Sequence, residues 1–195
     1  MITRRSVLVA FGAGLGAAAL PREGSATVAR PVSLGELTHS SHHALLALPV
    51  SMVCSRQRGR YGTHLVTHTR LRVTRSLDGR PPASADLLLQ TLGGRLDGVG
   101  EIVHGEAVPR IGKESLFFVY RIRERLHGVT AMAQGHYPVV RVGSADPVLR
   151  ASKHLPRWPE SHRAAATRAA SVVLAGRSLP DAERLIFREL HGDAP

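Results

Sequence analysis

The alternation of hydrophobic and polar positions predicts a chain built mainly of β-strands. The clearest strand covers residues 63–76, where Leu65, Leu71 and Val73 share one face with threonines and the other face is polar and charged. A period of two combined with many β-branched residues is typical of a half-buried antiparallel strand. One face of this strand is therefore expected to pack on a core while the other faces solvent.

Apolar runs elsewhere predict further strands at 44–53, 86–92, 115–122 and 129–134, with the last run able to continue through 139–141. Pro49 indicates an edge or a bulge in the first of these, and residues 56–62 indicate a hairpin loop. The glycine block 93–100 favours a glycine-lined bulge or a wide turn. Short strands separated by turn signals favour a small barrel or sandwich.

Two helices are expected to flank the strands. Residues 30–44 begin with the capping-box pattern of Ser33 and Glu36, and residues 180–190 carry an apolar stripe behind a capping serine. Residues 164–175 are compatible with a helix or a strand. The predicted fold class is mainly β (α+β), a small five- or six-stranded antiparallel barrel or sandwich with a short N-terminal and a C-terminal helix.

The N-terminus has the pattern of a twin-arginine export signal. Arg4 and Arg5 precede a weakly apolar run over 7–20, and small residues at Ala26 and Ala29 offer cleavage sites. The run is too short to span a bilayer, and no later stretch is long enough to do so. We therefore expect a signal peptide at 1–29, a periplasmic or extracellular mature protein, and no transmembrane span.

The remaining chain contains no internal repeat and divides into two parts that differ in their predicted secondary structure. A β-barrel-like domain is expected over 30–142, followed by a linker and a helix packed on that domain over 143–195. The 195 residues are 43% hydrophobic and 21% charged, which is close to the globular average. The single cysteine, Cys54, excludes an internal disulfide framework and a cysteine-rich zinc site.

The charge balance is strongly basic and rests on arginine. The formal net charge is +11, and all but two of the 26 cationic residues are arginine. Such a chain is attracted to polyanions. The arginines are spread along the chain and aromatic residues make up only 4%, so a base-stacking nucleic-acid surface is not indicated and no nucleic-acid partner is expected.

The polar face of the strand at 63–76 is the candidate binding surface. It presents two histidines and two arginines at alternate positions, namely His64, His68, Arg70 and Arg72. We expect this face to dock an envelope protein or an anionic polymer. The sequence marks no catalytic set: it lacks a phosphate-binding loop and a serine nucleophile elbow.

A metal site is the alternative interpretation. Glu36, His39 and His43 follow one another at helical spacing, so a helix over 30–44 would place three ligand-type groups on one face. Zinc or copper would be the corresponding ion. The chain would then be a metal-binding protein or a metal-dependent hydrolase; the binding interpretation requires no cofactor.

Several glycine-containing blocks carry a family resemblance. They are Leu88–Gly94, Gly98–Gly100, Gly105–Ala107, Ile111–Lys113, Leu116–Phe118 and Met132–Val139. In these blocks the chain resembles an uncharacterised family of twin-arginine-exported bacterial proteins of myxobacterial type. That resemblance implies an exported β domain without an assigned activity. The strand-rich half also has a faint likeness to netrin-like barrels, although it lacks their cysteines.

Together these features predict an exported, non-catalytic binding or accessory module of the cell envelope, whose ligand the sequence does not specify.

Overall fold

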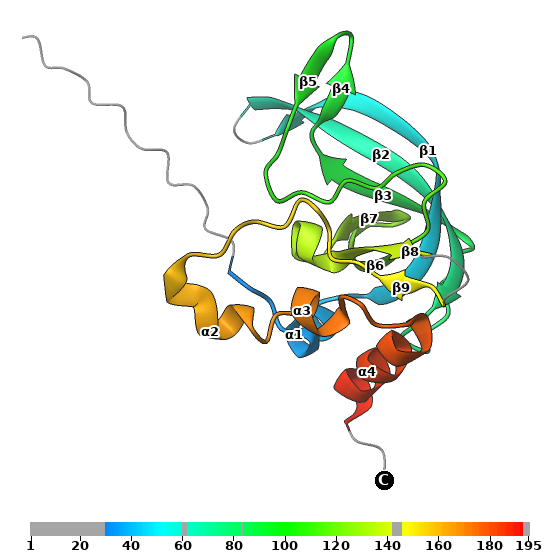
Figure 1. Cartoon of the computed structure of the whole chain (residues 1–195). Helices are drawn as coiled ribbons and strands as arrows, with labels where there is room; N and C mark the ends of the chain where they lie inside the picture. The colour runs from blue at the N-terminus through cyan, green and yellow to red at the C-terminus, as the bar shows by residue number, and fades with distance from the viewer. Residues whose placement is uncertain (1–29, 60–61, 83, 142–145, 193–195) are drawn as a thin grey trace, which may run out of the picture.

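The computed structural model describes residues 30–59, 62–82, 84–141 and 146–192 (Figure 1). The predicted signal peptide, with Arg4 and Arg5, lies outside these residues. Within them, no helix has the length and apolar character needed to cross a membrane.

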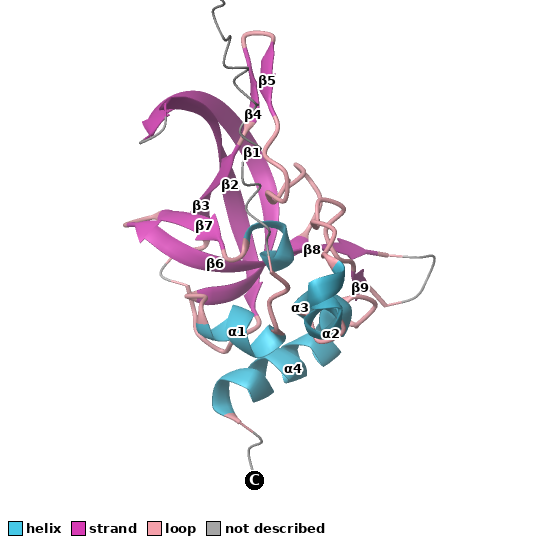
Figure 2. Cartoon of the chain, turned by 90° about the vertical axis from the view of Figure 1, so that its left-hand side faces the viewer, coloured by secondary structure: helices cyan, strands magenta, loops and turns pink. Residues whose placement is uncertain are grey.

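The fold is mainly β, as predicted. The nine strands of the described residues are β1 (His43–Gly59), β2 (Gly62–Ser76), β3 (Asp86–Leu92), β4 (Gly94–Leu96), β5 (Val99–Glu101), β6 (Ser115–Arg123), β7 (Leu126–Val129), β8 (His136–Val140) and β9 (Val148–Leu149). Four short helices accompany them: α1 (Leu34–His39), α2 (Arg163–Ala166), α3 (Ala170–Leu174) and α4 (Leu179–His191). Figure 2 shows the curved strands on one side and the helices gathered at one end.

Seven strands form one sheet in the order β1-β2-β3-β7-β6-β8-β9, and β1 also pairs with β6. The pairings therefore run round a ring from β1 through β2, β3, β7 and β6 back to β1. The ring is uneven. β1 and β2 form a long ribbon, whereas β3 and β7 pair only over residues 88–90 and 126–128.

The prediction of an antiparallel sheet of five or six strands is wrong in strand number and in one strand direction. β3 and β7 run parallel, and the main sheet is mixed. Apolar alternation reports which residues are buried but carries no information on strand direction. The parallel neighbours are separated by more than thirty residues of chain (93–125), so no local turn signal could identify the pair.

The first part of β6, residues 115–119, lies at the centre of the molecule and is buried on both faces. Phe117 and Val119 pack inside the strand ring, while Leu116 and Phe118 pack on the opposite side against the helices. This explains the continuous apolar run at 116–119, which is typical of strands covered on both sides. The sheet thus separates two apolar cores.

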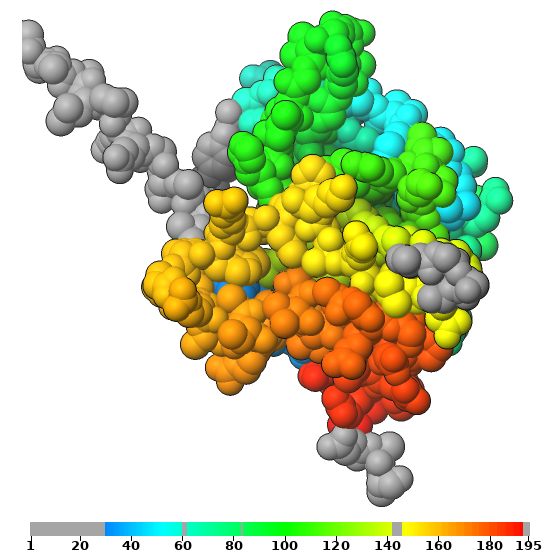
Figure 3. Space-filling view, viewed as in Figure 1, coloured from blue at the N-terminus to red at the C-terminus, as the bar shows by residue number. Residues whose placement is uncertain are grey.

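The helices cover the outer core. Leu34 and Leu37 of α1 lie in the same buried cluster as Ala182 and Ile186 of α4 and Leu174 of α3. The space-filling view shows the C-terminal segment, coloured orange to red, forming the lower part of the surface (Figure 3). The stripe predicted for 180–190 is confirmed: Ile186 is fully buried, and Leu185 and Leu190 pack at the edge of this core.

The predicted first helix is too long. Ser33 caps it as expected, with its hydroxyl accepting the Glu36 N–H, but the helix ends at His39 and His43 begins β1. Glu36 forms an ion pair with Arg30 instead of reaching back to the cap. The first helix is therefore a short element of the outer core.

The predicted strand at 129–134 is also displaced. Residues 126–129 form β7, a 3₁₀ turn occupies Met132–Gly135, and β8 follows. Ala131 and Met132 adopt left-handed backbone angles, with φ of 53° and 57°, which is incompatible with a continuous strand. The segment 164–175, for which the sequence allowed a helix or a strand, is largely helical: it contains most of α2 and all of α3, with a break between them.

The glycine-rich stretch forms a second, two-stranded sheet, β4–β5, which projects from the ring beside the ends of β1 and β2 (Figure 1). Gly94, at a φ of 140°, packs tightly at its base. A Cβ there would lie 2.4 Å from Thr67 Oγ1 and 2.7 Å from Cys54 Sγ. The expected wide turn is thus a hairpin anchored by a glycine contact with β1 and β2.

Candidate functional site

The four predicted binding residues all lie on the outer face of β2. Arg70 and Arg72 are exposed, and His64 and His68 are half-buried. Because strand residues rise by about 3.4 Å each, the face from His64 to Arg72 is a strip roughly 27 Å long rather than a compact pocket. Here we call these four residues, together with the adjoining outer faces of β1 and β3, the β2 strip.

Neighbouring strands hold the two histidines in place. His64 Nδ1 lies 3.4 Å from Glu101 Oε1, and His68 Nε2 lies 3.1 Å from Gln90 Oε1. Glu101 also accepts the Leu65 N–H at 2.6 Å, so β5 is tied to this end of β2. The histidines thus form the structured end of the strip.

The arginines form its open end. Among the described residues, the side chains of Arg70 and Arg72 have neither an ion pair nor a hydrogen bond. Arg70 lies opposite Leu88 in register and Arg72 opposite Asp86, which is itself exposed. Both guanidinium groups are therefore placed to meet a partner from solvent.

Apolar side chains flank the basic ones on the same face. Val53 of β1 is paired with His68, and Leu88 and Leu92 of β3 are paired with Arg70 and Val66. Val53 is 65% exposed and Leu92 is 47% exposed. The β2 strip thus combines positive charge with apolar contact area.

The predicted metal ligands are not brought together on one helical face. Glu36 is paired with Arg30, His39 Nδ1 lies 2.8 Å from the Gly35 carbonyl oxygen, and His43 lies beyond the helix. Among the residues that the structure describes, no group of three or more histidine, cysteine, aspartate or glutamate side chains could hold a metal ion. The helical arrangement failed because the helix ends three residues after Glu36.

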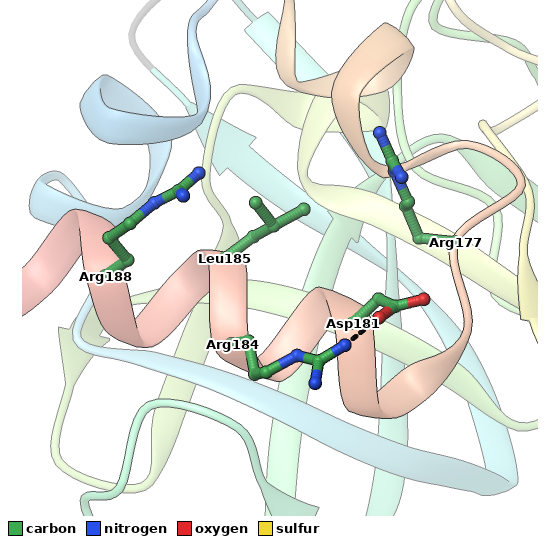
Figure 4. Close-up of a pocket in the computed structure, with 5 residues that line it drawn as sticks. All are labelled: Arg177, Asp181, Arg184, Leu185 and Arg188. Atoms are coloured by element: carbon green, nitrogen blue, oxygen red, sulfur yellow. Dashed lines mark hydrogen bonds and ion pairs between the residues drawn. The ribbon is translucent and has the colours of Figure 1, made fainter. Parts of the chain in front are cut away.

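A second basic feature lies at the start of α4, where a cavity of about 310 Å³ is lined by Arg177, Asp181, Arg184, Leu185 and Arg188 (Figure 4). Asp181 forms an ion pair with Arg184, as the dashed line marks, and Arg177 Nε donates to the Val173 carbonyl at 3.3 Å. The side chains of Arg177 and Arg184 are therefore already engaged by groups of the chain itself. The sequence did not single out this cluster because its arginines come from a loop and from one helix that is otherwise predicted by its apolar stripe.

Buried Asp78 joins the beginning of β1 to the end of β2. Its carboxylate accepts the Ala44 N–H at 3.2 Å and the Arg80 N–H at 3.0 Å, and it also accepts the Ser76 hydroxyl. His43 Nδ1 lies 3.5 Å from the same carboxylate. Burial opposes ionisation, but these hydrogen bonds and the charge of Arg80 outweigh it and hold the pKa of Asp78 below its usual value. The site is structural because it fixes the register of the long ribbon.

His136 is a buried histidine that the sequence could not distinguish from the other ten. It is 3% exposed and stacks on Phe117 with ring centroids 4.9 Å apart. Neither ring nitrogen has a hydrogen-bond partner among the described residues. Burial, helped by the nearby His154, lowers the pKa of His136 to about 4. The ring is therefore neutral in the folded chain near neutral pH.

Searches against known protein families and against curated proteins find no match for this chain.

Proposed function

We propose that this chain is an exported, non-catalytic binding module of the cell envelope and that the β2 strip is its docking surface. The observation that carries the proposal is the pair Arg70 and Arg72, exposed and unpaired among the described residues on a face that also presents Val53, Leu88 and Leu92. A partner that brings negative charge and some apolar surface would satisfy both properties.

The arrangement of strands supports this choice of face. The five paired strands of the ring form a small, partly open barrel. In small barrels of the OB-fold type, oligomeric ligands lie across the second and third strands. The β2 strip occupies the corresponding outer region of β2 and β3, so we place the partner there.

An anionic polymer is the partner that the charge of the chain favours. The net charge of +11 attracts polyanions over long distances, and an extended chain of charges fits a strip better than it fits a pocket. An acidic envelope protein is the other partner compatible with the same surface.

Reversing the two arginine charges is expected to remove this interaction. The variant Arg70→Glu with Arg72→Glu should bind immobilised heparin, used as the anionic probe, at least about tenfold more weakly at low ionic strength. The slope of log affinity against log salt should fall by about two, since each cation in contact contributes roughly one. Elution and titration over a salt series measure both quantities.

A matched variant controls for net charge. Arg157→Glu with Arg168→Glu changes the charge equally at exposed positions outside the strip. It should retain most of the affinity of the parent. If both double variants lose affinity to the same extent, the positive charge is acting non-specifically and the β2 strip has no special role.

Export is proposed from the twin-arginine pattern and from the resemblance to exported bacterial proteins. The conservative variant Arg4→Lys with Arg5→Lys keeps the charge but removes the paired arginines that define the signal. We expect the parent to reach the periplasm or the medium with a new N-terminus after residue 26 or 29, and the variant to stay uncleaved in the cytoplasm. Cell fractionation with N-terminal sequencing measures this, and equal export of both forms would contradict the signal.

A further inference from the structure

A cavity of about 360 Å³ opens at the mouth of the strand ring, beside the base of the β4–β5 hairpin. Its lining includes Met52, Cys54, Thr67, Thr91, Arg95 and Ala107. The register explains why these residues meet, because Cys54 pairs with Thr67 and Thr67 pairs with Thr91 across the inner faces of β1, β2 and β3. The mouth of a β-barrel is a common position for a small-molecule site, and the volume lies in the usual range for one.

The cavity borders the inner core. Ala107, which lines it, belongs to the same buried cluster as Leu89, Phe117 and Val129. Most of the remaining lining is apolar, and the Thr67 hydroxyl is already used, since it donates to the Gly93 carbonyl at 2.8 Å. An apolar chain would therefore find apolar walls and few competing polar groups.

Arg95 is the one charged residue of the lining. Within the described part of the chain its side chain makes no ion pair and no hydrogen bond. The nearby carboxylates are engaged elsewhere: Glu106 accepts the Leu92 and Ala107 N–H groups, and Glu101 accepts the Leu65 N–H. A single uncompensated guanidinium thus stands at the edge of an apolar cavity.

From this combination we propose that the cavity binds a linear aliphatic carboxylate, with the hydrocarbon chain among Met52, Cys54 and Ala107 and the carboxylate at Arg95. Arginine pairs with carboxylates through two parallel hydrogen bonds, which selects this head group over a neutral one. The site is distinct from the β2 strip, because Met52, Cys54, Thr67 and Thr91 lie on the opposite face of the sheet, and Leu92 borders both features. It does not depend on the docking proposal.

Cys54 provides a direct reporter of occupancy. It is the only cysteine of the chain, it is half-buried, and it lies in the cavity wall. The rate of its alkylation by N-ethylmaleimide should fall as decanoate is added, by about tenfold when decanoate is at ten times its dissociation constant. Affinity should rise about fourfold for each methylene from hexanoate to octanoate and decanoate.

The variant Arg95→Gln tests the head group. It should weaken decanoate binding about tenfold and leave the weaker protection by decanol unchanged. Arg123→Gln, an exposed arginine at the turn between β6 and β7, is the matched control and should bind decanoate as the parent does. Three outcomes would each overturn the proposal. Decanoate fails to protect Cys54, decanol protects it as well as decanoate does, or Arg95→Gln binds decanoate with unchanged affinity.

Discussion

Replacing Asp78 by alanine should lower the free energy of unfolding by about 3 kcal/mol, because the Ala44 and Arg80 N–H groups would lose their acceptor. Arg80 is half exposed, so its guanidinium can return to water, and we do not expect the larger loss that follows when a fully buried cation is left unpaired. Chemical denaturation at pH 7 measures the change.

The loss should also depend on pH. Because the pKa of Asp78 is lower in the folded chain than in the unfolded chain, its contribution is complete above the unfolded pKa near 4 and disappears as the pH falls through the folded pKa. The parent and Asp78→Ala should therefore differ most near neutrality. Glu160→Ala is the control: Glu160 is an exposed carboxylate, 2.9 Å from Arg163, whose removal should cost about 0.5 kcal/mol or less. Similar losses for the two variants would contradict the role of Asp78 in fixing the ribbon.

The second large effect is expected in acid, at His136. The pKa of this ring is about 4 in the folded chain and 6.5 in the unfolded chain. Between these pH values the unfolded chain therefore binds more protons than the folded one. Stability should accordingly fall as the pH decreases from 6.5 to 4, by about 3 kcal/mol from this residue alone. Unfolding free energies over that pH range measure the slope.

The variant His136→Leu should remove this part of the slope and cost little at pH 7, since it also removes two nitrogens without hydrogen-bond partners among the described residues. Tyr137→Phe is the neighbouring control. Its hydroxyl is buried and lacks a hydrogen-bond partner within the same residues, but it does not titrate in acid. Tyr137→Phe should retain the full acid slope. A slope that survives in His136→Leu would place the acid sensitivity elsewhere.

The strands that the sequence predicted correctly carry a signal within their own residues. β2 was predicted from the alternation over residues 63–76, in which Leu65, Thr69 and Leu71 are buried, and β3 and β6 were predicted from short apolar runs. The bulge at Pro49 was also readable, since the β1–β2 register shifts between Pro49 and Ser51. In each case the signal lies within a few residues of the feature.

The features that were missed depend on contacts between distant segments. The parallel partner of β3 comes from residues 126–128, and the burial of His136 follows from the pairing of β8 with β6. The cavity at the ring mouth joins residues 52, 54, 67, 91–95 and 107–109, which no spacing rule connects. Conversely, the spacing of Glu36, His39 and His43 indicated a shared face only on the assumption of a helix that the chain does not form over that length.

For the four predicted binding residues, the sequence predicted the shared face but not the residues that surround it. Strand periodicity placed His64, His68, Arg70 and Arg72 on one exposed face, and the structure has them there. Their apolar neighbours Val53, Leu88 and Leu92 could not be assigned to that face without the register of three strands. The chemistry of the surface therefore emerges from the sheet rather than from one strand.

The docking surface is tested most directly by arginine footprinting on the unmutated protein. Phenylglyoxal modification of the purified protein, read by peptide mass spectrometry with and without heparin, reports which guanidinium groups the polymer covers. We expect strong protection of Arg70 and Arg72 and little change at Arg157 and Arg168. Protection confined to Arg177 and Arg184 at the start of α4, with Arg70 and Arg72 still fully reactive, would contradict this expectation.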